Sequence, residues 1–165
     1  MEILNKQPWL APGANGEVRK DPAWKEAVTA FIREGFKPSE PVLHSWFFGA
    51  FGIIEPDKCG SVNEAQRAQL AYLGNMEALK KELLEEHQIA LRSVRGVGYE
   101  IVPPTEQTQW AQQEIKAELG KAVRTGRARL INVQLDMLTD EQKKENMDAQ
   151  AKLSFFKKSA RKALE

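Results

Sequence analysis

The chain has 165 residues, of which 42% are hydrophobic and 28% are charged, and these values exclude a wholly disordered protein. Its formal net charge of +1 excludes a global excess of positive charge, so any binding to nucleic acid must depend on local patches. The single cysteine, Cys59, excludes an internal disulfide and suits a reducing cytoplasm.

Two further features bear on where the protein resides. The first residues contain no basic start followed by an apolar run, so no signal peptide is apparent. The most apolar stretch, residues 42–54, is too short to cross a bilayer. We therefore expect a cytoplasmic protein that does not associate with a membrane.

Residues 1–21 are expected to form an N-terminal arm, because prolines and glycines interrupt every regular pattern there. Trp9 and Leu10 would pin this arm to the body of the protein. A first helix is predicted to begin at residues 21–22, with aspartate as its cap and proline in its first turn, and to end at Gly35. Its apolar face comprises Trp24, Val28, Phe31 and Ile32.

A second helix is predicted to start at residues 39–41, where Ser-Glu-Pro supplies a start signal, and to weaken at Gly49 and Gly52. A broad apolar face follows that start. Large aromatic side chains in the first two helices are expected to pack in the core rather than to stack on bases. They are Trp24, Trp46, Phe47, Phe48 and Phe51.

A long third helix is predicted to begin at Ser61, because Glu64 three residues later completes a capping-box pattern. It extends to about Glu86, and Gly74 is expected to mark a bend. Its apolar periodicity is carried by Leu70, Leu73, Met76 or Glu77, Leu79 or Lys80, Leu83 and Leu84.

The period changes over residues 89–102, which predict two short strands joined by a turn that contains glycine. The prolines at 103–104 close this unit and mark the clearest boundary in the chain. Beyond it, Thr105 and Thr108 introduce another helix, with an apolar stripe from Ala111 to Val123. Thr139 and Gln142 form a second capping-box pattern and open a last helix that ends near Ala163.

Three helices followed by a two-stranded hairpin is the order of a winged helix-turn-helix. The run from Leu91 to Val102 contains Val-Arg-Gly-Val-Gly-Tyr and resembles the terminal wing of OmpR-type response-regulator effector domains. The run Leu-Lys-Lys-Glu-Leu at 79–83 resembles the basic stretch late in that family's recognition helix. Residues 40–43 and 51–52 resemble the start and end of the preceding helix, so the resemblance covers residues 39–102.

The resemblance implies an α+β fold, mainly α. From the patterns along the whole chain we expect an N-terminal arm (1–21), a winged helix-turn-helix domain (22–104) and a C-terminal helical extension (105–165). The resemblance also implies that Arg95 reaches the minor groove and that Tyr99 packs under the hairpin. The chain has no receiver domain, so it would act as a stand-alone binder. We expect the DNA contacts to come from Asn63, Gln66, Arg67, Asn75, Lys80, Lys81, Arg92, Ser93 and Arg95.

The C-terminal extension carries two basic patches, and the second lies beside Phe155 and Phe156. These patches either grip DNA, form a face for a partner, or are solvated helix faces. The extension is expected to dimerise the protein or to lengthen its footprint on DNA. The patches comprise Lys121, Arg124, Arg127 and Arg129, then Lys152, Lys157, Lys158, Arg161 and Lys162.

Nothing in the sequence specifies an enzyme, a cofactor or a metal. Neither His44 nor His87 lies at metal-ligand spacing from Cys59, and a catalytic pair of cysteine and histidine is only a formal alternative. The run Gly-Val-Gly at 96–98 lacks the third glycine and the helix of a dinucleotide-binding loop.

Three functional hypotheses follow. The first is a non-enzymatic protein that binds duplex DNA, either a transcriptional regulator or a phage-type accessory factor. The second is a protein-interaction module that inhibits or adapts host transcription or defence machinery. It is favoured by the glutamates of the predicted recognition helix, at 77, 82, 85 and 86. The third is a replication initiator or partition protein with the same fold.

Overall fold

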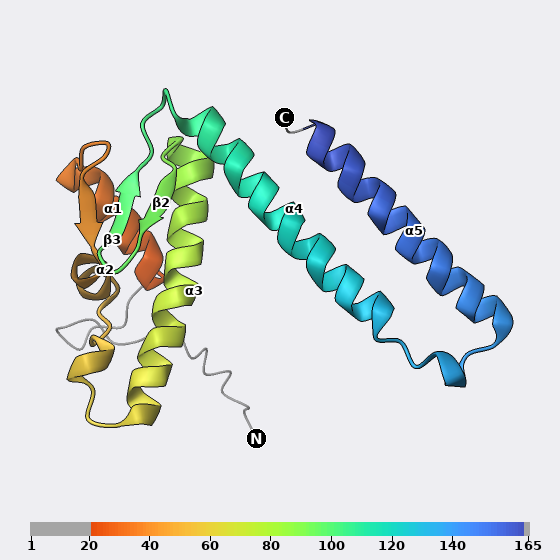
Figure 1. Cartoon of the computed structure of the whole chain (residues 1–165). Coiled ribbons are helices and arrows are strands. Elements are labelled where there is room, and N and C mark those ends of the chain that lie inside the picture. The colour runs from red at the N-terminus through yellow and green to blue at the C-terminus, as the bar shows by residue number, and fades with distance from the viewer. Residues whose placement is uncertain (1–20, 164–165) are drawn as a thin grey trace, which may run out of the picture. The chain divides into compact units, whose positions relative to one another are not determined.

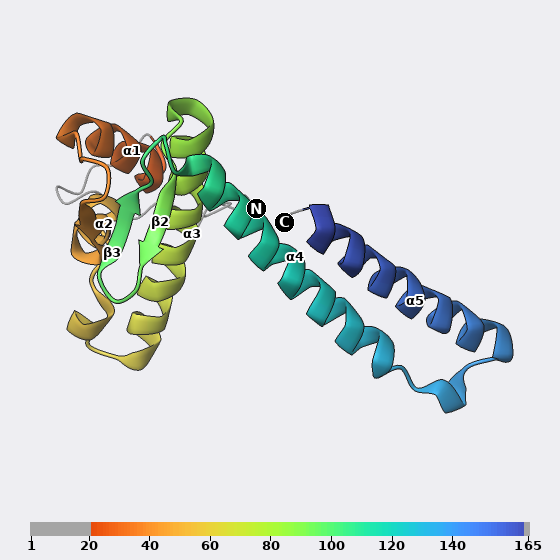
Figure 2. The same cartoon turned by 45° about the horizontal axis from the view of Figure 1, so that its top comes forward.

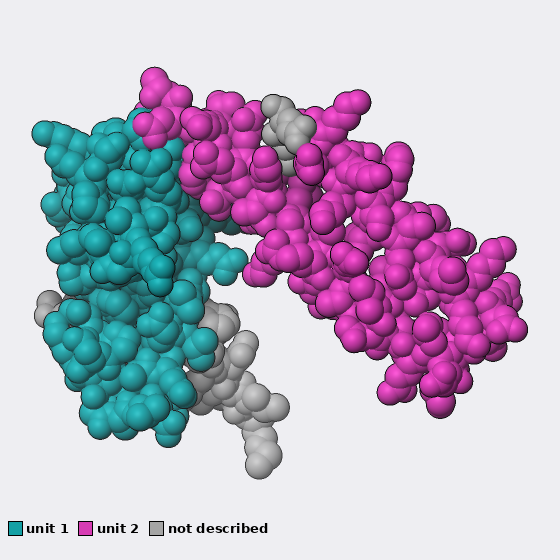
Figure 3. All heavy atoms as spheres, in the orientation of Figure 1, with its two compact units in different colours: residues 1–103 teal, residues 104–165 magenta. Residues whose placement is uncertain are grey.

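The computed structural model describes residues 21–163, so the predicted arm, with Trp9 and Leu10, lies outside the described residues. Five α-helices and three short strands make up this part of the chain (Figure 1). The prediction of a mainly helical α+β fold with long C-terminal helices is confirmed. The chain divides into two compact units, residues 1–103 and 104–165, which Figure 3 draws in teal and magenta.

Helix α1 (Ala23–Glu34) begins one residue later than predicted, because Pro22 rather than Asp21 occupies the capping position. The Pro22 carbonyl accepts a hydrogen bond from the amide of Lys25, with 2.9 Å between the two atoms. Gly35 ends the helix in a left-handed conformation, at a φ of 64°. The helix packs through Ala27, Val28 and Phe31, which are buried.

The predicted start of the second helix at residues 39–41 is wrong. Pro41–Leu43 pairs with residues 98–100 and so forms strand β1 instead of the first turn of a helix. Val42 in this strand is buried. Helix α2 (His44–Phe51) begins directly after the strand and ends at Gly52, which has a φ of 67°.

Helix α3 (Val62–His87) follows a short 3₁₀ turn, η1 (Pro56–Lys58). The Ser61 hydroxyl accepts a hydrogen bond from the Glu64 amide at 3.3 Å, as the capping pattern predicted. The helix is continuous through Gly74. Only its C-terminal two-thirds enter the core, through Tyr72, Met76, Leu79 and Leu83.

The predicted hairpin is confirmed as strands β2 (Leu91–Val94) and β3 (Gly98–Ile101). The sequence did not reveal that β1 joins it, so the sheet has three antiparallel strands in the order β1-β3-β2. One face of this sheet contributes Val42, Leu91 and Ile101 to the core. The aromatic residues of α1 and α2 complete that core, and Phe47 lies 5.6 Å from Tyr99 between ring centroids.

The second unit is a helical hairpin of α4 (Gln107–Ile131) and α5 (Asp140–Ala163), joined through the 3₁₀ turn η2 (Leu135–Met137). The two helices lie side by side in both views (Figures 1 and 2). Gly126 of α4 faces the Leu153 side chain of α5, and a Cβ atom at position 126 would lie 3.5 Å from it, in ordinary van der Waals contact. Side-chain amides of α5 reach the Leu130 carbonyl of α4, from Asn146 at 3.2 Å and from Gln150 at 3.5 Å.

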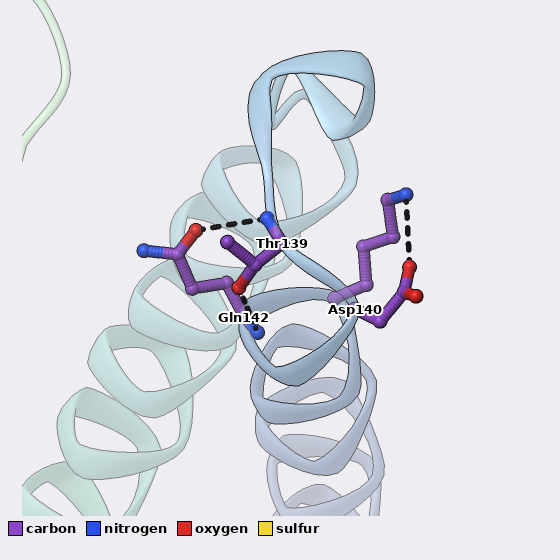
Figure 4. Close-up of polar contacts among 4 residues, drawn as sticks. Thr139, Asp140 and Gln142 are labelled. Atoms are coloured by element: carbon purple, nitrogen blue, oxygen red, sulfur yellow. Dashed lines mark hydrogen bonds and ion pairs between the residues drawn. The ribbon is translucent and has the colours of Figure 1, made fainter.

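The start of α5 is a complete capping box (Figure 4). The Thr139 amide donates to Oε1 of Gln142 at 3.0 Å, and the Gln142 amide donates to Oγ1 of Thr139 at 3.2 Å. Both groups would otherwise be unsatisfied at the helix N-terminus. The predicted start of the last helix is therefore confirmed.

Candidate nucleic-acid interface

Helix α3 and the β2–β3 hairpin lie side by side in both ribbon views (Figures 1 and 2). The exposed side of α3 and the turn of the hairpin form the candidate interface. One contact holds the hairpin against α3, and a second holds it against the start of α2. The Lys80 ammonium group lies 5.3 Å from the centroid of the Tyr99 ring, a cation–π contact between the helix and β3. The Tyr99 ring also meets His44 edge-to-face, at 5.6 Å between centroids.

Tyr72 and Tyr99 act as neutral anchors beneath this surface. A hydrogen bond of 2.6 Å joins the Tyr72 hydroxyl to Nδ1 of His44, and so ties α3 to the start of α2. Burial raises the pKa of Tyr72 and that of Tyr99 above the ordinary value for tyrosine, because the phenolate form loses its hydration. Both hydroxyls therefore hold their protons to a higher pH than an exposed tyrosine would.

The hairpin turn presents Arg95 to solvent on a fixed backbone. Gly96 has a φ of 72°, a conformation that favours glycine, and the Val97 amide donates to the Val94 carbonyl at 3.0 Å. The Val97 carbonyl accepts from the His44 amide, also at 3.0 Å, and so fixes the turn to the end of β1. Arg95 is exposed.

The predicted contact residues of β2 have different surroundings. Arg92 forms an ion pair with Glu100 directly across the strand pair, in the register that places these two residues opposite one another. Glu100 therefore offsets the charge that Arg92 would offer to phosphate. Ser93 is exposed on the same strand.

The predicted contact residues of α3 fall into two groups whose centres are about 23 Å apart along the helix, at a rise of 1.5 Å per residue. Near its start, Asn63, Gln66 and Arg67 are exposed. Lys80 and Lys81 lie near its other end, with Lys81 exposed and Lys80 partly covered. Asn75 lies between the groups, and its side-chain amide donates to the carbonyl of residue 71 in its own helix at 2.8 Å.

The structure also reveals an exposed apolar surface on α3 that the sequence reading missed. Leu70, Leu73 and Leu84 were expected among the residues that give the helix its apolar periodicity, but they are 71%, 50% and 45% exposed. The buried stripe passes through Tyr72 and Leu79 instead. The sequence did contain a signal for this surface, because α3 carries two apolar stripes. A helix that packs through one face can bury only one of them.

No group of histidine, cysteine or acidic residues within 21–163 is arranged to hold a metal ion. Within the same range, no helix is both long and apolar enough to cross a bilayer. The Cys59 thiol donates to the Glu55 carbonyl at 3.6 Å, whereas His44 bonds to Tyr72, so these two side chains do not form a hydrogen-bonded pair.

Comparison of the sequence with protein-family models and with curated proteins, and of the structure with solved structures, finds no match.

Proposed function

We propose that residues 22–104 form a winged helix-turn-helix and that the protein is a non-enzymatic binder of duplex DNA. The observation that carries this proposal is the arrangement of the first unit. The elements follow one another as α1-β1-α2-α3-β2-β3, and the strands lie in the order β1-β3-β2. In this arrangement a hairpin with Arg95 in its turn lies beside α3, a helix with one exposed side. A helix of this kind fits the major groove, and a hairpin beside it reaches the backbone or the minor groove.

Recognition would divide between the two elements. Helix α3 would offer Asn63, Gln66 and Arg67 to base edges and phosphates, and Lys81 to the backbone. Arg95 would reach the minor groove from the hairpin turn. The proposal includes no catalytic residue and no cofactor. It places the protein in the cytoplasm as a stand-alone regulator of transcription or a phage-type accessory factor, with a replication or partition role as a variant of the same activity.

The test is a titration of a labelled duplex with the full chain at several salt concentrations. We expect the double variant R95A/K81A to weaken binding. The slope of log K against log salt is negative, and its magnitude should fall by about 1.8, at about 0.9 per lost phosphate contact. The control is K37A, an exposed lysine between α1 and β1, which should leave the slope unchanged. Equal binding by the double variant and the wild type would overturn the proposed role of this surface.

A protein partner on the same surface is the second candidate, and the exposed leucines at positions 70, 73 and 84 favour it. In that case the full chain would inhibit or redirect a transcription reaction without binding its template. The double variant L70S/L73S would abolish this effect, whereas R95A/K81A would not. Loss of the effect with R95A/K81A alone would favour DNA binding.

We also propose a homodimer through the C-terminal hairpin. No described residue of the second unit, 104–163, is buried, so α4 and α5 enclose no core of their own. A second copy would supply the missing layer, as in a four-helix bundle. Leu130, Ala149 and Phe156 border one apolar depression between the helices and are the residues it would cover. Sedimentation should give a dimer for the wild type and a monomer for F156S; a wild-type monomer at all concentrations would contradict this.

A further inference from the structure

A second concave surface runs between α4 and α5, and it is strongly cationic. We call it the cationic groove and define it by the residues that line its two adjoining depressions. Its floor is apolar, formed by Leu119, Val123 and Leu153. Six cationic side chains line it, and no carboxylate does: Lys116, Arg124, Arg127, Lys157, Lys158 and Arg161.

The charge of this groove follows from the sequence of both helices. Residues 119–131 in α4 and 149–163 in α5 contain no aspartate or glutamate. The close approach of Gly126 to Leu153 places these two segments alongside one another. The acidic residues of the second unit lie outside both segments. No carboxylate within the two segments therefore offsets the cations that these segments carry.

Most of these cations have no ionic partner in the structure. Within residues 21–163, no ion pair engages Lys116, Arg124, Arg127, Lys157 or Lys158. Holding like charges together costs free energy, which a bound polyanion would offset by releasing its own counterions. The groove therefore has the electrostatic character of a site for a multiply charged anion.

The length of the groove indicates which kind of anion fits. Lys116 and Arg127 are eleven residues apart in α4, which corresponds to about 16 Å at the helical rise. Phosphates along one DNA strand repeat about every 3.4 Å of axis, so the groove spans roughly five of them. A single phosphate would engage only part of this cationic row.

The link to the first unit is short. Residues 102–106 alone separate the end of β3 from the start of α4. Five residues span at most about 18 Å when extended, so a duplex held by the first unit would stand at a high effective concentration for the second.

We propose that the cationic groove binds the phosphate backbone of the same duplex that the first unit recognises. The inference rests on the proposed function for the identity of its ligand and adds a second site to it. Arg124, Arg127 and Lys157 make the phosphate contacts, and the apolar floor lies under the backbone without reading bases. The groove thus adds affinity and salt dependence rather than sequence specificity.

The experiment titrates a labelled 30-base-pair duplex with the full chain over a salt series, and circular dichroism verifies helix content. The triple variant R124A/R127A/K157A should lower the slope of log K against log salt by about 2.7, and R124K/R127K should retain the wild-type slope. The matched control is R33A/K37A/K144A, which removes three exposed cations that do not line the groove. It should change the slope little.

An unchanged slope in the groove variant, or an equal fall in both triple variants, would overturn the proposal. So would binding to vesicles of anionic lipid, or to an acidic peptide, that depends on the groove while duplex binding does not. The outcome separates the two sites. If R95A/K81A binds as the wild type does and the groove variant does not, the groove stands and the proposed role of the first unit fails. If instead R95A/K81A loses binding and the groove variant binds as the wild type does, the role of the first unit stands and the proposal for the groove fails.

Discussion

Gly98 in β3 lies directly against Val42 in β1, so closely that a side chain at position 98 would overlap the Val42 carbonyl oxygen. The same added Cβ atom would lie 2.9 Å from the Val42 carbonyl carbon and 3.0 Å from the His44 amide nitrogen. Backbone cannot yield as a flexible side chain does. Glycine at this position therefore lets the hairpin join β1 and sets the hairpin against the rest of the first unit.

The two glycines of the hairpin should differ in their effect on stability. We expect G98A to lower the free energy of unfolding by about 3 kcal/mol, because the sheet must open to admit a methyl group. G96A should cost about 1 kcal/mol, since only its positive φ opposes the substitution and nothing lies within 4 Å of the added atom. Chemical denaturation of both variants measures this order, and a larger loss for G96A would contradict it.

The capping box of α5 predicts a local effect on the second unit. T139A removes the hydroxyl that accepts from the Gln142 amide and should destabilise the helical hairpin by about 1 kcal/mol. T139S should retain the wild-type stability, because its hydroxyl can make the same bond. Thermal melts followed by circular dichroism compare the two, and equal losses would show that the hydroxyl plays no part.

Alkaline pH should destabilise the first unit. The pKa values of Tyr72 and Tyr99 are raised in the folded protein, whereas tyrosine in the unfolded chain titrates near its ordinary value of about 10. Above that pH the unfolded state releases protons that the folded state retains, so the stability present at lower pH is lost as pH rises. Y72F should reduce this dependence, and denaturation between neutral pH and pH about 11 measures it. Identical curves for Y72F and the wild type would refute the link.

The ion pair across the hairpin predicts a gain in DNA binding. E100Q removes the carboxylate that offsets Arg92, so more of the positive charge of Arg92 would act on phosphate. We expect tighter binding and a slope of log K against log salt that steepens by about 0.9. A Glu34→Gln variant at the end of α1 loses the same charge away from α3 and the hairpin, and serves as the control. An equal gain in both variants would indicate a general charge effect.

Local patterns predicted the helices and the hairpin, because caps, turns and apolar spacing act over a few residues. Ser61 with Glu64, Thr139 with Gln142, and the glycine of the turn each form the contacts that their patterns indicate. Strand β1 could not be predicted this way. Its three residues become a strand only through pairing with β3, which lies more than fifty positions away in the sequence.

Less of the candidate interface than of the fold could be predicted from the sequence. Arg92 belongs to the same hairpin as Arg95, and only the register of β2 with β3 reveals that Glu100 pairs with it. The exposure of Leu70 and Leu73 likewise depends on which stripe of α3 meets α1 and α2. Both are consequences of tertiary packing, which a single sequence does not encode in its local pattern.

The most direct test of the central claim is a titration of the isotope-labelled full chain with duplex DNA, followed by amide chemical shifts in NMR spectra. If the first unit binds DNA, we expect the largest shifts at Arg95 and Gly96 in the hairpin turn and along the exposed side of α3, and we expect salt to reverse them. Shifts absent from both elements while other parts of the chain respond, or no response to DNA at low salt, would contradict it.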